Sequence, residues 1–252
     1  MDIIEELIEN KPHLEDPLRF YEKSLRFMNG VSALGVLSRP GLNAYPSEFI
    51  GPILDRFGSA FDLPEGILSP LKQALELGEI DFTRLPLLEV PAFSLPYPED
   101  DLTMILFLLS RPYFIGMQGG LPGNNRLGNE GTCRVCSARP SLLSGTPEGR
   151  QQLYCSFCGT EGTYEANGCP ACHNQDPARL DTIVFENDAG FRVRVCTVCR
   201  SYVKIVNRDL LVRLTPDLAD LISLPLDIAV QEKGYKRSSP NAIGMVRMSG
   251  RG

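Results

Sequence analysis

The first part of the chain has the apolar periodicity of α-helices. Four segments carry apolar residues at three- and four-residue spacing behind a turn, a cap or a proline. These segments are residues 16–30, 45–57, 69–78 and 100–114. Before the fourth, Pro86, Pro91, Pro96 and Pro98 predict an extended connector, because proline lacks a backbone donor and disfavours helix at the residue before it. The pattern predicts a helical domain over residues 1–118.

The second part of the chain changes to the alternating pattern of β-hairpins. Residues 119–131, GGLPGNNRLGNEG, have the composition of a flexible linker. Beyond them, a strand-like run, the turn GTPEG and a second run form one unit, and the turn ENDAG stands at the centre of another. This repeat predicts two hairpin modules, residues 132–166 and 167–214, and the second also contains a strand over 201–206, after its hairpin.

Helical signals return near the C-terminus, over residues 215–252. Thr215-Pro216 predicts a cap and a first helical turn, and Pro225 is expected to kink or restart the helix. The remainder, residues 234–252, is predicted to be irregular with a mobile end. The fold class predicted is therefore α+β, with a helical N-terminal domain, two hairpin modules and a C-terminal helix.

All eight cysteines fall into four Cys-x-x-Cys pairs, two in each module. The pairs are Cys133/Cys136, Cys155/Cys158, Cys169/Cys172 and Cys196/Cys199. Two thiolate pairs complete a closed tetrahedral site, so four pairs predict two tetrathiolate metal ions. A hairpin folds the second pair of each module back onto the first, as in zinc ribbons and rubredoxin-like knuckles. Closed sites support structure or electron transfer rather than hydrolysis.

Two features of these sites stay open at the level of sequence. Sequential pairing keeps each module's ligands together and is favoured by the repeat, while a nested arrangement of the middle pairs is the alternative. Zinc and iron both accept four thiolates, so the donor set does not choose between them.

Composition favours a cytoplasmic protein without a membrane segment. No apolar run approaches the roughly 18–20 residues of a membrane span, and the acidic N-terminus does not have the pattern of a secretory signal. Because cytosolic thiols stay reduced, eight cysteines are more readily explained there as metal ligands than as disulfides.

Charge argues against a nucleic-acid partner. Residues 1–118 hold 9 Lys+Arg against 18 Asp+Glu, and residues 119–252 hold 16 against 13. Four thiolates around a divalent ion leave a charge of −2, so two such sites would turn the +3 of the second part into −1. Phosphate binding requires a basic stripe that this balance does not predict.

Other polar residues receive structural interpretations, and no catalytic residue is predicted. His173 directly follows Cys172 and is interpreted as a turn residue, and His13 lies in an acidic, exposed segment. The acidic run 99–101 is interpreted as a helix cap. The run 235–237, Tyr-Lys-Arg, is either a partner-binding surface or a solvated turn.

The cysteine segments and the sequence after them form a recognisable set. They read GTCRVCSARP, LYCSFCGTE, NGCPACH and RVCTVCRSYVKIV, followed by LPLDIAVQEKGYKRSSPN. This set, over residues 131–241, resembles formate dehydrogenase accessory (formation) proteins of the FdhE family. The resemblance implies a cytoplasmic factor that matures respiratory formate dehydrogenases, contacts their molybdenum- or tungsten-containing catalytic subunit, binds iron at two rubredoxin-like sites and turns over no substrate.

The resemblance also marks individual positions. It implies that the eight cysteines are metal ligands, and it identifies four family-like positions without an assigned role. These are Asp227, Gly234, Tyr235 and Asn241. Ser137 and His173 stand after a Cys pair, where glycine is usual in the family.

These observations lead to one expected function and two alternatives. We expect a non-enzymatic assembly factor that binds the formate dehydrogenase catalytic subunit through its metal-binding scaffold. A zinc-ribbon nucleic-acid-binding protein is the first alternative, suggested by five basic residues: Arg192, Arg194, Arg200, Lys204 and Arg208. A thiol oxidoreductase that uses one free Cys pair is the second.

Overall fold

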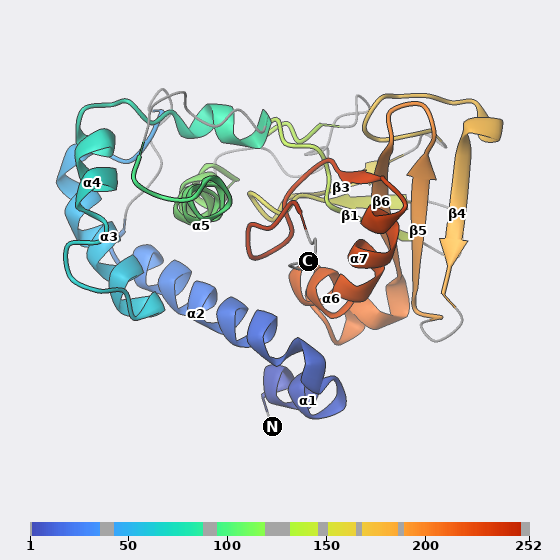
Figure 1. Cartoon of the computed structure of the whole chain (residues 1–252), viewed down its shortest axis with the longest axis horizontal. Helices are drawn as coiled ribbons and strands as arrows, with labels where there is room; N and C mark the ends of the chain where they lie inside the picture. The colour runs from blue at the N-terminus through green and yellow to red at the C-terminus, as the bar shows by residue number, and fades with distance from the viewer. Residues whose placement is uncertain are drawn as a thin grey trace. The chain divides into compact units, whose positions relative to one another are not determined.

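The computed structural model divides the chain into two units, Met1–Gly120 and Leu121–Gly252. It describes residues 2–35, 43–87, 95–118, 132–145, 151–164, 168–185 and 189–247 (Figure 1). The predicted linker 119–131, Pro91, most of both hairpin turns and the last five residues lie outside the described residues. Among the described residues, none of the helices combines the length and the apolar character that crossing a bilayer requires.

The first unit is helical, as the apolar spacing predicts. Its α-helices are α1 (Ile3–Asn10), α2 (Glu15–Ser32), α3 (Ser47–Phe61), α4 (Ser69–Glu76) and α5 (Glu99–Gln118), with 3-10 helices η1 (Pro12–Leu14) and η2 (Phe82–Leu87). Four of the α-helices confirm the predicted segments, while α1, capped by the Asp2 side chain, was not predicted. Pro86 lies inside η2, so the prediction of an extended connector is wrong at that position.

Aromatic side chains form much of the core of the helical unit. Tyr45, Phe82 and Tyr113 meet edge to face, with ring centroids 5.5 to 6.0 Å apart. The buried Tyr45 hydroxyl donates to the Leu109 carbonyl at 2.8 Å, which satisfies its polar atom. These contacts join α5 to the segments before α3 and after α4.

The second unit is built on a single seven-stranded sheet. Its strands are β1 (Leu142–Gly145), β2 (Gln151–Tyr154), β3 (Glu161–Tyr164), β4 (Leu180–Val184), β5 (Phe191–Cys196), β6 (Ser201–Asn207) and β7 (Lys236–Arg237). The order is β3-β2-β1-β6-β5-β4, and β7 pairs with β6. Each predicted module supplies three antiparallel strands, and the parallel pairing of β1 with β6 joins the two sets. The predicted α+β class is confirmed, and the two modules share one sheet.

Two short helices follow the sheet: α6 (Pro216–Ile222) and α7 (Leu224–Glu232), with η4 (Arg208–Val212) before them. The Thr215 hydroxyl accepts from the Leu218 amide, as the cap signal predicts, and the helix restarts just before Pro225. The segment that follows was predicted to be irregular. It instead adds β7 to the sheet in parallel with β6, and Arg237, Ser239 and Asn241 in it are buried.

Candidate metal centre

The structure gathers the eight cysteines into two groups of four in the sequential arrangement. The first group holds Cys133, Cys136, Cys155 and Cys158, and the second holds Cys169, Cys172, Cys196 and Cys199. In each group the sulfur atoms all lie within 4.8 Å of one another. Since the sequence has eight cysteines, no Cys-x-x-Cys pair stands outside these two groups.

Each group lies where a hairpin brings two turns together. Cys133 and Cys136 precede β1, and the second pair of the first group lies between β2 and β3. The second group repeats this order around the β4–β5 hairpin: Cys196 is the last residue of β5, and Cys199 lies between β5 and β6. The same hairpin that pairs the strands therefore closes the four-sulfur group.

Every Cys-x-x-Cys turn, called a knuckle here, ends in a residue with left-handed backbone. The residues after the second cysteine are Ser137, Gly159, His173 and Arg200, with φ of 63°, 67°, 60° and 57°. In the first knuckle the Ser137 amide donates to the Cys133 carbonyl at 2.7 Å, and the Cys133 amide donates to the Ala138 carbonyl at 2.8 Å. The knuckles that begin at Cys155 and Cys169 repeat both bonds. This turn directs both sulfurs of a knuckle to the same point.

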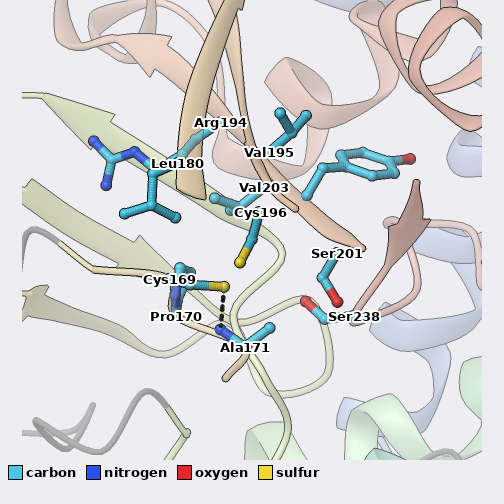
Figure 2. Close-up of a pocket in the computed structure, with 11 residues that line it drawn as sticks. Cys169, Pro170, Ala171, Leu180, Arg194, Val195, Cys196, Ser201, Val203 and Ser238 are labelled. Carbon is cyan, nitrogen blue, oxygen red and sulfur yellow. Dashed lines mark hydrogen bonds between the residues drawn. The ribbon is translucent and has the colours of Figure 1, made fainter. Parts of the chain in front are cut away.

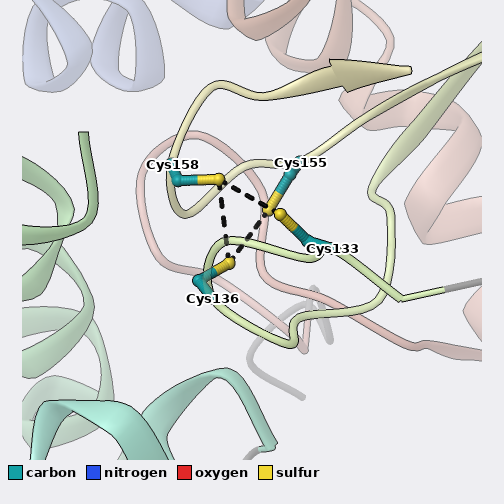
Figure 3. A group of neighbouring side chains, drawn as sticks. All are labelled: Cys133, Cys136, Cys155 and Cys158. Carbon is teal, nitrogen blue, oxygen red and sulfur yellow. Dashed lines mark hydrogen bonds between the residues drawn. The ribbon is translucent and has the colours of Figure 1, made fainter. Parts of the chain in front are cut away.

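The first group is compact and enclosed (Figure 3). Cys133 Sγ lies 3.3 Å from Cys158 Sγ, and Cys136 Sγ lies 3.4 Å from Cys155 Sγ and 3.8 Å from Cys158 Sγ. All four cysteines are at most 5% exposed. The Cys158 thiol also donates to Thr160 Oγ1 at 2.9 Å, and this hydroxyl becomes the donor once the sulfur is a thiolate.

The second group is less enclosed. Cys169 Sγ lies 3.7 Å from Cys199 Sγ, and Cys172 Sγ lies 3.8 Å from Cys196 Sγ. Cys169 and Cys196 are buried, whereas Cys172 and Cys199 are partly exposed. The Ala171 amide donates to Cys169 Sγ at 3.4 Å (Figure 2). A cavity of about 10 Å³, the size of one water molecule, adjoins Cys169 and Cys196.

Hydrogen bonding between neighbouring thiols and burial shift the pKa values of the cysteines in opposite directions. In the first group, hydrogen bonds from its three neighbours lower the pKa of Cys133, while burial raises the pKa of Cys136. In the second group burial raises the pKa of Cys169. Burial opposes ionisation of Cys199 too, but hydrogen bonds from Ser201 bring the pKa of this thiol down to about 7. Four thiolates this close require a compensating cation, because buried like charges disfavour one another's ionisation.

The sulfur geometry fits a tetrahedral metal ion. A tetrahedron with metal–sulfur bonds of about 2.3 Å has sulfur–sulfur edges of about 3.8 Å. The two separations in the second group, 3.7 and 3.8 Å, match this edge, and those in the first group, 3.3 to 3.8 Å, are equal or slightly shorter. Each group can therefore hold one ion such as zinc or iron, with all four positions filled by sulfur.

Comparison with known proteins finds similarity to FdhE proteins. The family model described as "FdhE, C-terminal domain" matches residues 168–243, which include the second cysteine group. A protein named "Protein FdhE homolog" from Aquifex aeolicus is 32% identical over 44% of this chain and 41% of its own length. The Haemophilus influenzae (strain PittEE) protein of the same name is 30% identical over 51% of this chain and 44% of its own length. The chain is therefore similar in sequence to FdhE proteins.

The FdhE resemblance extends to the fold of the whole chain. The crystal structure of the FdhE protein from Pseudomonas aeruginosa matches with a TM-score of 0.67 at 20% identity, over 98% of this chain and 94% of that one. In sequence, the chain matches less than half the length of the Aquifex and Haemophilus relatives. A Stutzerimonas stutzeri relative matches over 65% of its length at 27% identity.

The structure shows the surroundings of several residues whose roles the sequence left open. His173 is an exposed turn residue in the left-handed region. Gly234 has φ of 78°, and the Arg200 guanidinium stacks on the Tyr235 ring at 4.4 Å. Asn241 is buried, and its side-chain oxygen Oδ1 accepts hydrogen bonds from the amides of Ile243 and Met245.

The proposed basic stripe of the nucleic-acid alternative is wrong in part. Lys204 is fully buried, and Arg194 is only partly exposed, with its guanidinium donating to Gln151 Oε1 at 3.2 Å. Arg237, considered as part of a surface patch, is 5% exposed. Lys204 does not belong to an exposed basic surface, because β6 is buried on both faces over most of its length.

A buried ionic network beneath α6 and α7 was not predicted. Lys204 Nζ lies 2.6 Å from a carboxylate oxygen of both Asp220 and Asp227, and Arg237 contacts the same two residues at 2.9 and 2.6 Å. Burial alone would raise the pKa of Asp220, but Arg237 and Lys204 hold it below its usual range. Two cations and two carboxylates balance, so the network fastens β6, β7, α6 and α7 without net charge. A lysine inside the apolar run of β6 is the sequence signal that points to it.

Proposed function

We propose that this protein is a non-enzymatic accessory factor in the maturation of formate dehydrogenase, and that its cysteine unit is a metal-stabilised surface that binds the catalytic subunit in the cytoplasm. The observation that carries the proposal is the pair of complete four-sulfur groups within one sheet. A metal ion with four protein ligands has no open position for substrate, so its contribution is to hold the surrounding loops in place. Similarity to FdhE proteins suggests the partner in this proposal.

The arrangement of cysteines disfavours the thiol oxidoreductase. That alternative requires a Cys pair free of metal, and all eight cysteines lie in the two groups. The nucleic-acid alternative loses its strongest support with the burial of Lys204, because a buried cation paired with carboxylates cannot neutralise phosphate.

Co-purification from cells that make a formate dehydrogenase tests the proposal. The tagged chain is expressed in a strain without its own accessory protein, and the captured proteins and the formate dehydrogenase activity are measured together. We expect the catalytic subunit to be captured and activity to be restored. Cys133→Ser and Cys196→Ser remove one proposed ligand from each group, so both variants are expected to lose most of the activity.

Val212→Ser serves as the matched control, because Val212 is 84% exposed in η4 and contributes no sulfur. It is expected to behave as the unmodified chain. Normal activity with both cysteine variants, or failure to capture the catalytic subunit with the unmodified chain, would refute the proposal.

A further inference from the structure

The two cysteine groups differ in how far solvent reaches them. In the first group, three of the four residues between the cysteines are buried: Val135, Ser156 and Phe157 at 8%, 3% and 1% exposure. The C-terminal segment contributes to this cover, because Ser239 Oγ lies 3.1 Å from Ser156 Oγ. A reagent therefore reaches these sulfurs only when part of the unit opens.

The second group is open on one side. Its last knuckle, Thr197 and Val198 between Cys196 and Cys199, is exposed, with Val198 at 58%. His173, which follows Cys172, is exposed as well, and both Cys172 and Cys199 are partly exposed. One cysteine from each of the two knuckles is thus accessible on the folded protein, while Cys169 and Cys196 are buried, at 4% and 1% exposure.

We propose that the second group is an exchangeable metal site and the first a permanent one. This inference rests on the metal binding in the proposed function. A chelator removes a metal by replacing its ligands one at a time, and the partly exposed Cys172 and Cys199 are the ligands that it can displace without unfolding the sheet. The first group offers no such ligand, so its ion leaves only after local unfolding. The folded chain therefore gains and loses its second ion while the first keeps the scaffold intact.

Zinc release with simultaneous alkylation tests the inference on the unmodified chain. Protein loaded with two zinc ions is mixed with excess chromogenic chelator and iodoacetamide, and peptide mass spectrometry follows the alkylation of each freed thiolate over time. We expect two phases of equal amplitude, the first at least about tenfold faster than the second, since one site opens locally and the other does not. Labelling of Cys169, Cys172, Cys196 and Cys199 should follow the fast phase, and labelling of the first group the slow phase.

Two variants sharpen the assignment. Phe157→Leu thins the cover of the first group and is expected to speed up the slow phase alone. Val184→Ala, which changes a 63% exposed side chain at the sheet edge, is the control and should alter neither phase by more than about twofold.

Release of both ions in a single phase, or labelling of the first group in step with or ahead of the second, would overturn the inference. Such a result leaves the accessory function standing, because two permanent sites also form a binding scaffold. Loss of partner capture with unchanged two-phase release would refute the accessory function alone.

Discussion

Single backbone positions decide whether each knuckle can close. Three of the four residues that follow the second cysteine of a pair are not glycine, although all four have left-handed backbone. This conformation disfavours an ordinary side chain by about 1–2 kcal/mol. The paired backbone bonds of the knuckles that begin at Cys133, Cys155 and Cys169 hold it nevertheless, so closing the sulfur group outweighs a local preference.

Gly168 is the position where a single methyl group should do most damage. A Cβ there would lie 2.7 Å from the Asn174 carbonyl oxygen, the atom that accepts the Cys169 amide at the start of the third knuckle. Gly168→Ala must therefore displace this knuckle, and we expect it to destabilise the zinc-loaded unit by about 1–3 kcal/mol. Denaturant unfolding followed by circular dichroism measures the change, and metal analysis shows whether the second ion is retained.

Gly145→Ala is the control for that substitution. Gly145 is the last residue of β1 in the same unit. A Cβ added there would meet nothing within 4 Å, and the Gly145 backbone is not left-handed. We expect a change of less than about 1 kcal/mol, or slight stabilisation. Equal stability of the two variants would show that the knuckle tolerates a shift.

The roles of residues whose partners are close in sequence could be predicted. The roles of residues whose partners are distant in sequence could not. The cysteine spacing predicts the ligand groups, because a knuckle and a hairpin are local structures. Lys204 finds its partners Asp220 and Asp227 on two later helices, and no periodicity in β6 encodes that pairing. The partner of a buried charge is a property of the tertiary fold.

At the scale of elements, β6 is the centre of the second unit. It pairs with β5 on one edge and with β1 and β7 on the other, and its Lys204 and Tyr202 reach the α7 carboxylate of Asp227. The strand therefore connects both modules and the C-terminal segment. A change in the ionic network of Lys204 is therefore expected to destabilise the whole sheet.

Asp227→Asn tests that connection. The substitution keeps the shape of the side chain but leaves the buried Lys204 and Arg237 with a single carboxylate, so we expect a loss of about 3–5 kcal/mol. Asp181→Asn in β4 is the same change at an exposed position, and it should shift stability by less than about 0.5 kcal/mol. The test compares the denaturant midpoints of the two zinc-loaded variants. Equal midpoints would show that the network is dispensable for stability.

Elements with strong local signals were predicted, and those that depend on pairing were missed. The hairpin strands β4 and β5 and the helices behind proline follow from turn and cap residues. Strand β3 was missed although the internal repeat marks it, since it follows the β1–β2 hairpin as β6 follows the β4–β5 hairpin. Strand β7 has two residues and exists only because β6 offers a free edge.

At the scale of the molecule, the two units depend on different forces. The helical unit has an apolar and aromatic core, and the structure describes no cysteine in it. The sheet unit also buries apolar strand residues, but its turns and strand ends carry eight cysteines in two groups that a metal ion would hold together. The second unit should therefore depend on metal, as small domains with tetrathiolate sites do, whereas the first should not.

Metal removal should separate the units in one experiment. We expect complete demetallation of the reduced protein to increase amide hydrogen exchange throughout β1 to β6, because the energy of metal binding is part of the folding energy of these hairpins. Amides of α2, α3 and α5 should keep their protection, which makes the helical unit an internal control. Readdition of zinc should restore protection in the sheet, and a sheet that stays protected without metal would show that strand pairing and the ionic network suffice to hold the unit together.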